Sequence, residues 1–245
     1  MHQRENSTGR VALVLGSSGG IGSAVMETLW HNGIHVAGID IERPRQAPAD
    51  PGFMFVQADA ASEEELQQAV AQVAGEYRRI DYAINMIGIV GHGPLADTSL
   101  ADWQLVLDVN LNSCFLLAKY GYPHLRASQG GLVFCSSTNG LNGGNALSGA
   151  AYAAAKAAIL NLNRYLAREW ASDGIRVNCI APGPVDTPML RRLPERELAA
   201  IRATIPTGRF STAAEVAEAV VFLCSDAAAT RTGTVTNISG GLYMD

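Results

Sequence analysis

Val11-Ala-Leu-Val-Leu-Gly16-Ser-Ser-Gly19-Gly20-Ile-Gly22 joins an apolar run to a glycine-rich turn, and the helical stretch Ile21–Trp30 follows. The run Val11–Leu15 is typical of a buried strand. Glycines after such a strand allow a tight bend, and they let the N–H groups at the start of the helix approach a pyrophosphate. Many turns carry glycine for geometry alone, so the context has to support this interpretation. The segment predicts the opening strand, turn and helix of a nucleotide-binding fold.

Apolar, β-branched runs alternate with helical stretches along the rest of the chain. This alternation is typical of a parallel sheet that helices cover on both faces. After Val11–Leu15 we expect strands at Ile34–Ile39, Phe53–Gln57, Tyr82–Met86, Leu132–Cys135, Ile175–Ile180 and Thr234–Ile238. With no linker or internal repeat, residues 1–245 are expected to form one α/β domain, a doubly wound Rossmann fold of about seven strands.

The helical stretches between these strands complete the pattern. We expect helices at Ile21–Trp30, Ser62–Tyr77, Leu100–Tyr122, around Tyr152, at Glu195–Ala203 and at Ala213–Ser225. The second of them opens with Ser62-Glu63-Glu64-Glu65, which fits a capping box.

Composition narrows the possible functions. The 245 residues are 48% apolar, so the chain can bury a large core. Its net charge of −5 gives no reason to expect nucleic acid or an anionic membrane as a partner. The N-terminus has no signal core and no stretch could span a bilayer, which favours a cytoplasmic protein. The four cysteines lie far apart and no His/Asp/Glu cluster has ligand spacing, so we expect reduced thiols and no metal.

An acidic residue, Asp40, ends the expected second strand. A carboxylate in that position accepts hydrogen bonds from the adenosine ribose hydroxyls and repels a 2′-phosphate. Glu42 adds to the repulsion, and the glycine turn contains no Arg or Lys. Arg43 and Arg45 could act in the opposite sense, but we interpret them as part of a solvated, proline-flanked loop. The sequence therefore predicts NAD rather than NADP as the cofactor.

A second informative segment runs from Ser137 to Lys156, after the expected strand Leu132–Cys135. A loop of small residues leads into an alanine-rich helix that carries Tyr152 and Lys156. Residues four apart lie on one face of a helix. A fixed ammonium beside a phenol favours the phenolate, which makes the tyrosine a usable acid and base near neutral pH. The alternative is a chance pair on a surface helix, so the cofactor site decides between the two interpretations.

With both segments in view, the sequence resembles the short-chain dehydrogenase/reductase family over essentially the whole chain after Gly9. The family's T-G-x-x-x-G-x-G pattern matches at Gly16, Gly20 and Gly22, with Leu15 in place of the threonine. The other matching motifs are Asp59-Ala60, Asn85-Met86-Ile87-Gly88 in place of N-N-A-G, Asn110, the Tyr152/Lys156 pair and the segment from Arg176 to Thr187.

The resemblance implies the roles of the catalytic residues. Ser137 would hydrogen-bond the substrate oxygen, and Tyr152 would exchange a proton with it. Lys156 would hold the nicotinamide ribose, and Asn110 would interrupt its helix and anchor a water that relays protons. The cofactor contacts implied are Gly16, Ser18, Gly19, Gly20, Ile21, Gly22, Asp40, Ile41, Asp59, Ala60, Met86, Gly88, Tyr152, Lys156, Pro182, Gly183, Val185 and Thr187.

Several departures from the family pattern bear on the site. Ser136 and Ser137 both end the strand, and we select Ser137 because its spacing to Gly140 fits the family's S-x-x-G. The interval from Ser137 to Tyr152 is longer than usual, and the additional residues are expected in a loop, Leu141–Ala151, beside the substrate.

The second departure replaces polar groups by apolar ones near the centre of the sheet. We expect Leu15 and Met86-Ile87 to be linked, with an apolar contact in place of a hydrogen bond, because losing one partner alone would strand a buried polar group. The cofactor contact at Met86 would then use backbone atoms.

The loops around the expected substrate site contain further polar residues. In the family, the segment at about residues 188–210 is a lid over the substrate. His92 could contact the substrate or be a solvated loop residue. Four arginines of the lid segment lie near glutamates, which favours a solvated helix face; they are Arg191, Arg192, Arg196 and Arg202. Asn139, Asn142 and Asn145 are interpreted as turn formers.

The resemblance thus implies an NAD(H)-dependent oxidoreductase acting on a secondary alcohol or its ketone. One alternative is an NADPH-dependent 3-oxoacyl carrier-protein reductase, against which Asp40 argues. Another is a non-catalytic nucleotide-sensing protein on the same fold, against which the complete catalytic set argues. Family members are commonly tetramers, and the apolar segment Gly240–Met244 resembles a subunit-contact tail, so a homotetramer is expected.

Overall fold

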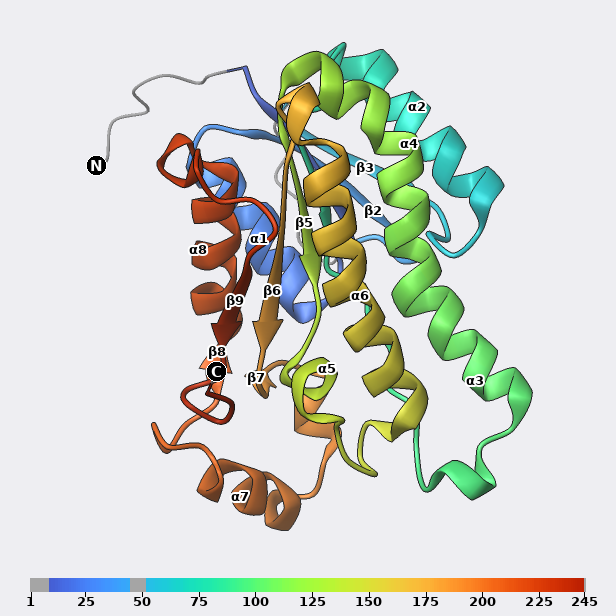
Figure 1. Ribbon diagram of the computed structural model, residues 1–245, viewed down its shortest axis with the longest axis vertical. Helices are drawn as coiled ribbons and strands as arrows, with labels where there is room; N and C mark the ends of the chain where they lie inside the picture. The colour runs from blue at the N-terminus through green and yellow to red at the C-terminus, as the bar shows by residue number, and fades with distance from the viewer. Residues whose placement is uncertain (1–8, 45–51, 245) are drawn as a thin grey trace.

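A parallel sheet of seven strands forms the centre of the computed structural model, which describes residues 9–44 and 52–244 (Figure 1). The strand order is β3-β2-β1-β4-β5-β6-β9. These strands are β1 (Val11–Leu15), β2 (His35–Asp40), β3 (Phe53–Gln57), β4 (Tyr82–Asn85), β5 (Gly131–Cys135), β6 (Arg176–Pro182) and β9 (Val235–Ile238). The chain runs outward in one direction from β1 and in the other from β4, and ligands bind at such a switch point in open α/β sheets.

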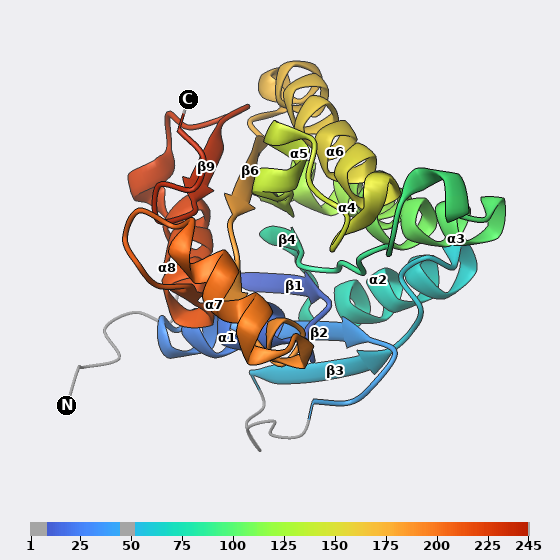
Figure 2. The same ribbon diagram turned by 90° about the horizontal axis from the view of Figure 1, so that it is seen from below.

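Helices cover both faces of the sheet, as the alternation predicted. On one face lie α1 (Gly20–His31) and α8 (Ala213–Cys224), and on the other lie α2 (Glu63–Tyr77), α4 (Ser113–Ser128) and α6 (Gly149–Glu169) (Figures 1 and 2). Successive residues of a strand point to opposite faces. Leu13 and Leu15 of β1 accordingly pack in the core beneath α2, α4 and α6, whereas Ala12 and Val14 pack beneath α1 and α8. The doubly wound Rossmann fold is confirmed.

The expected strands are present with ends that differ by at most two residues, but the expected helix Leu100–Tyr122 is not continuous. It consists of α3 (Leu100–Leu107), a π-helical turn η2 (Asp108–Asn112) and α4, which continues through Pro123 to Ser128. Fully buried Leu125 holds the last turns of α4 in the core, so packing outweighs the missing N–H of the proline.

The capping box expected at Ser62 is only half formed. The Ser62 hydroxyl accepts the N–H of Glu65 at 3.4 Å, but the Glu65 carboxylate accepts the N–H of Asp59 at 2.9 Å. A complete capping box lies instead at the start of α8, where Thr212 and Glu215 exchange both hydrogen bonds. The preceding chain therefore decides which donor the glutamate reaches.

A second, small sheet pairs β7 (Val185–Asp186) with β8 (Ser211–Thr212). Between these strands lie a single turn, η4 (Leu190–Arg192), and α7 (Glu195–Ala203). Figure 2 shows α7 beyond the carboxyl ends of the central strands. The sheet thus anchors both ends of the predicted lid segment.

The arginines of this segment are engaged within it or solvated. Arg191 pairs with Asp186 through two hydrogen bonds of 2.7 and 2.9 Å. Arg202 lies 3.7 Å from Glu195 and over the ring of Phe210. Arg192 and Arg196 are exposed. These contacts favour the solvated-face interpretation over an anion site.

Leu15 and Ile87 share one face of the sheet, and Met86 lies on the other. Leu15 is 0% exposed in the core beneath α2, α4 and α6, and Ile87 packs against that same core. Met86 packs against the opposite core. We expected Leu15 to be in apolar contact with both Met86 and Ile87. The structure restricts this contact to Leu15 and Ile87.

We expect Leu15→Thr alone to lower the free energy of unfolding by about 1–3 kcal/mol, because it buries a hydroxyl among apolar neighbours. Urea unfolding at neutral pH measures this loss, with Leu100→Thr at an exposed position as the control. If the linkage holds, the cost in an Ile87→Ala background will differ from that in the wild type. A stabilising Leu15→Thr would contradict the linkage.

No helix in the described ranges is long and apolar enough to cross a membrane.

Candidate active site

The glycine turn between β1 and α1 is built for close backbone approach. Gly16 has φ +75°, and a Cβ on Gly22 would overlap the carbonyl oxygen of Gly16. Among the described residues no side chain caps the N-terminus of α1, and its first turn contains no acidic residue. Uncapped N–H groups at a helix N-terminus, together with the helix dipole, suit an anion. The turn fits the pyrophosphate of a dinucleotide.

The Asp40 carboxylate is fixed at the edge of this turn. One oxygen accepts the N–H of Ser18 at 2.9 Å, and the other accepts the N–H of Glu42 at 3.3 Å. The Ser18 hydroxyl donates to the Glu42 carbonyl at 2.5 Å and joins the turn to the loop after β2. Arg43 lies 6.0 Å over the ring of Phe55. Arg45 falls outside the described residues.

Three further predicted contacts, Ile41, Asp59 and Ala60, follow β2 and β3. Ile41, directly after Asp40, is 61% exposed, so its apolar surface is available to a ligand. The Asp59 carboxylate accepts the N–H of Ala61 at 2.9 Å, which makes a local turn, and Ala60 is buried. Asp59 is itself exposed. The structure thus leaves Ile41 and Asp59 open to solvent.

The segment after β6 meets the glycine turn. A Cβ on Gly20 would lie 2.8 Å from Cγ2 of Thr187 and 3.2 Å from Pro188. The neighbouring Gly183 donates its N–H to the carbonyl of Ile238 at 3.0 Å. The predicted contacts Pro182, Gly183, Val185 and Thr187 are therefore carried by a segment that passes the N-terminus of α1.

Tyr152 and Lys156 lie on one face of α6, as their spacing predicted. The Lys156 ammonium is 5.5 Å from the centre of the half-buried Tyr152 ring. It donates to the carbonyls of Cys135 at 2.8 Å and Ile87 at 3.3 Å, although the side chain is only 2% exposed. Burial by itself disfavours the ammonium, but the Tyr152 phenol and nearby thiols outweigh it, so the pKa of Lys156 is raised.

The two serines at the end of β5 have different partners. Ser136, which is buried, donates its hydroxyl to the carbonyl of Lys156 at 2.6 Å. Ser137 caps a short helix, α5 (Thr138–Asn142), and its hydroxyl accepts the N–H of Asn139 at 3.1 Å. The proton of that hydroxyl is not used in the cap, so it is available to a substrate oxygen. The geometry supports the choice of Ser137.

Asn110 lies in the π-helical turn and is 0% exposed. Its Nδ2 donates to the carbonyls of Val106 at 2.8 Å and Ile89 at 2.9 Å. Its Oδ1 is buried and has no hydrogen-bond partner among the described residues. The position of a Cβ on Gly88 would be 3.2 Å from that oxygen and 3.4 Å from Nζ of Lys156. Both polar atoms therefore lie close to Gly88. A bridging water requires two such polar partners.

The predicted loop Leu141–Ala151 is helical only at its two ends. Helix α5 ends at Asn142, α6 begins at Gly149, and only residues 143–148 connect them. Gly91 donates to the Ser148 carbonyl at 2.9 Å, and Gly93 donates to that of Ala146 at 3.2 Å. The connection therefore lies against the loop that carries His92, whose side chain is exposed.

Comparisons with known proteins agree with this arrangement. A family model described as enoyl-(acyl carrier protein) reductase matches residues 16–243. The chain belongs to the short-chain dehydrogenase/reductase family. It is accordingly an oxidoreductase of a family that uses a nicotinamide cofactor.

Individual relatives cover nearly the whole chain. The 3-oxoacyl-[acyl-carrier-protein] reductase FabG of Escherichia coli (strain K12) is 37% identical, over 98% of this chain and 99% of its own. The cis-4-hydroxycyclohexanecarboxylate dehydrogenase of Sinomonas cyclohexanicum is 34% identical, over 95% and 96%. The ligand-free aldohexose dehydrogenase (AldT) of Thermoplasma acidophilum superposes with a TM-score of 0.88 at 27% identity, over 97% and 96%.

Sequence reasoning about this short-chain dehydrogenase/reductase missed several groups around Lys156. The carbonyls of Cys135 and Ile87 carry no signal in the sequence, because every residue has a carbonyl. Gly140 was used only for spacing, yet a Cβ there would lie 2.6 Å from the carbonyl carbon of Lys156. Its small size could have indicated a close helix contact. Ser136 was set aside, although its hydroxyl joins β5 to α6.

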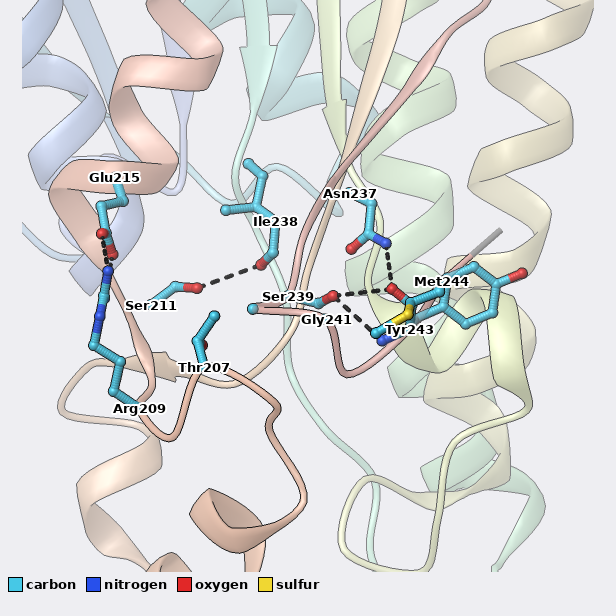
Figure 3. A pocket seen from close by; sticks show the side chains of 11 residues that line it. Thr207, Arg209, Ser211, Glu215, Asn237, Ile238, Ser239, Gly241, Tyr243 and Met244 are labelled. Carbon is cyan, nitrogen blue, oxygen red and sulfur yellow. Dashed lines mark hydrogen bonds and ion pairs between the residues drawn. The ribbon is translucent and has the colours of Figure 1, made fainter.

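The cavity in Figure 3 lies away from these residues. It has a volume of about 490 Å³ between the C-terminal segment and the residues that lead into α8. Arg209 and Glu215 form a bidentate pair at its edge, and hydrogen bonding to Arg209 lowers the pKa of Glu215 to about 2. Asn237 donates to the Tyr243 carbonyl at 2.7 Å and folds the tail back onto β9. None of the proposed catalytic residues lines it.

Proposed function

We propose that the protein is an NAD(H)-dependent oxidoreductase that interconverts a secondary alcohol and its ketone, with Tyr152 as the acid and base. The observation that carries this proposal is the buried Lys156 ammonium, 5.5 Å from the Tyr152 ring and adjacent to the Ser137 strand end through the Cys135 carbonyl. An ammonium is costly to bury and is retained where its charge has a use.

Each residue then has a defined task. Ser137 donates to the substrate oxygen and orients it, and Tyr152 takes the hydroxyl proton during oxidation or returns it during reduction. Lys156 hydrogen-bonds the ribose, and the free Oδ1 of Asn110 holds a water that passes protons to and from Lys156. The bound nicotinamide supplies or accepts the hydride. Residues 188–210 cover the substrate, and residues 1–245 act as one catalytic domain.

NAD is proposed because of how Asp40 is held. Backbone N–H groups of Ser18 and Glu42 orient its carboxylate beside the glycine turn, where it faces a ribose and repels a phosphate. The specific alternative is the NADPH-dependent 3-oxoacyl carrier-protein reductase. Its support is the 37% identity to a 3-oxoacyl-[acyl-carrier-protein] reductase over 98% of the chain.

Fluorescence titration with NADH and with NADPH distinguishes these two proposals. We expect tighter binding of NADH, and we expect Asp40→Ala to weaken it by about 10- to 100-fold, since charge-assisted hydrogen bonds contribute about 1.5–3 kcal/mol. Asp40→Arg should shift the preference towards NADPH. Glu42→Gln is the control, because its backbone contacts remain while one neighbouring charge is lost. A wild type that prefers NADPH would favour the carrier-protein reductase.

We further propose a homotetramer. Exposed apolar side chains on α4 and α6, Phe115 and Tyr165, and exposed Met244 in the tail offer surfaces for subunit contacts. Sedimentation equilibrium at micromolar protein measures the state directly, and a monomer would exclude this part of the proposal.

A further inference from the structure

The longer interval between Ser137 and Tyr152 raises a question of geometry. Two hydroxyls that act on one substrate oxygen must keep a fixed separation, yet the chain between them contains α5 and a six-residue connection, 143–148. Loops with glycine are intrinsically adaptable. The structure therefore needs bonds that hold α5 against α6.

Two contacts of this kind lie at Lys156, in the second turn of α6. The Ser136 hydroxyl donates to the Lys156 carbonyl at 2.6 Å. Gly140 lies so close to the same stretch of backbone that a Cβ would be 2.6 Å from the Lys156 carbonyl carbon. They fix α5 beside Lys156, and Tyr152 lies one turn nearer the start of α6.

A hydrogen bond from Asn139 reaches the start of α6. The side-chain amide of Asn139 donates to the hydroxyl of Ser148 at 2.8 Å. Asn139 also donates its backbone N–H to the Ser137 hydroxyl at 3.1 Å, and Ser148, 5% exposed, directly precedes α6. One side chain thus joins the turn that orients Ser137 to the first turn of the Tyr152 helix.

Ser148 is also hydrogen-bonded to the loop after β4. The Ser148 carbonyl accepts the N–H of Gly91 at 2.9 Å. At Gly149, where φ is +73°, a Cβ would lie 3.1 Å from the carbonyl carbon of Gly91 and the nitrogen of His92. Displacing Ser148 would therefore also displace the loop around His92.

The side chains of Asn142 and Asn145 accept hydrogen bonds within their own turns. Oδ1 of Asn142 accepts the N–H of Gly144 at 2.9 Å, and Oδ1 of Asn145 accepts that of Leu147 at 3.0 Å. They are turn formers, as the sequence suggested. Asn139 differs, because its side chain crosses from one helix to the next.

We infer that Asn139 is a positioning residue that holds Ser137 at a fixed distance from Tyr152, through Ser148, and thereby compensates for the longer connection. The inference rests on the proposed function, since it assumes that Ser137 and Tyr152 act on one substrate. It also makes the 143–148 connection a determinant of specificity, because the Gly91–Gly93 loop is hydrogen-bonded to it.

Steady-state kinetics of Asn139→Ala, Ser148→Ala and the double variant test this role. We expect each single variant to lower kcat by about 10- to 100-fold through misplacement of the reacting groups, with NADH affinity unchanged. The double variant should be no worse than the singles, because either change breaks the same bond. Asn139→Asp should recover only part of kcat, because its carboxylate can accept the Ser148 hydroxyl only if that hydroxyl leaves the Asn145 carbonyl, to which it donates at 3.2 Å. Asn142→Ala is the matched control and should keep wild-type kcat.

Amide hydrogen exchange at Gly91 gives a readout that does not depend on turnover. Exchange at Gly91 should become faster in Asn139→Ala and stay slow in Asn142→Ala. An unchanged kcat in Asn139→Ala, or unchanged exchange at Gly91, would overturn the inference. If the wild type oxidises no alcohol and reduces no ketone with either nicotinamide cofactor, the proposed function fails, and the Gly91 exchange alone decides whether Asn139 holds this region.

Discussion

Tyr152→Phe is expected to lower kcat by about 10²–10⁴-fold, the range typical of a lost general acid or base, while NADH binds as tightly as before. The ring keeps its half-buried place on α6, so the change removes the hydroxyl and little else. Lys156 keeps its carbonyl partners at Cys135 and Ile87, so the proposed ribose contact should be preserved. Stopped assays of NADH formation with the alcohol that the wild type oxidises fastest measure the loss.

Tyr165→Phe on the same helix provides the control. Tyr165 is 62% exposed, and its hydroxyl contacts only Glu169, at 3.2 Å, among the interactions of the described residues. It should keep wild-type kcat. A Tyr152→Phe variant that also kept it would remove Tyr152 from the chemistry and favour the nucleotide-sensing alternative. Lost NADH binding in Tyr152→Phe would instead show that Tyr152 supports the cofactor site.

The sheet could be predicted because each strand carries its own signal. Val11–Leu15 and Phe53–Gln57 are apolar runs bounded by turns, and the structure places them as β1 and β3 with the same ends. Helix α5 carried no such signal. Thr138–Asn142 is short and polar, and it is helical because Ser137 caps it and Gly140 fits against α6. Its stability comes from tertiary packing, which local propensity does not record.

The candidate site likewise combines side chains that the sequence predicted with groups that it did not predict. Tyr152 and Lys156 were predicted from their spacing on one helix, and Asn110 from the resemblance to the family. The groups that hold them are mostly backbone atoms, such as the carbonyls that receive the Lys156 ammonium. Asn139 was interpreted as a turn former because asparagine is common in turns. Only the fold shows that Ser148 lies within reach of its amide.

For the Leu15 departure, sequence reasoning named two neighbouring partners, Met86 and Ile87, and the structure keeps only Ile87. Met86 and Ile87 are adjacent in sequence, so the pattern could not separate them. Alternation along a strand places neighbours on opposite faces, and the structure puts Ile87, not Met86, on the face of Leu15. The alternation rule is sufficient to select Ile87 over Met86. Its use requires knowing that the strand geometry continues past Asn85, where β4 ends.

Gly22→Ala should weaken cofactor binding by up to about 100-fold and also destabilise the protein. A Cβ at this position would overlap the carbonyl oxygen of Gly16 and lie 2.8 Å from its carbonyl carbon. Both are backbone atoms, so no side chain can rotate away, and the turn has to shift relative to α1. The N–H groups that meet the pyrophosphate shift with it. Overpacking of this kind costs about 1–3 kcal/mol. If this free energy is lost from cofactor binding, the affinity for the cofactor falls by up to about 100-fold.

Gly75→Ala separates this effect from the general cost of replacing a helical glycine. Gly75 is exposed in α2, and a Cβ there meets nothing within 4 Å, so the change should stabilise by about 0.4–1 kcal/mol. NADH titration and urea unfolding of both variants give the comparison. Wild-type NADH affinity in Gly22→Ala would mean that the turn can shift without loss, and the pyrophosphate would then have to be held elsewhere. Weak binding with wild-type stability would show instead that the turn yields locally, and that tight glycine packing at the start of α1 serves the cofactor rather than the fold.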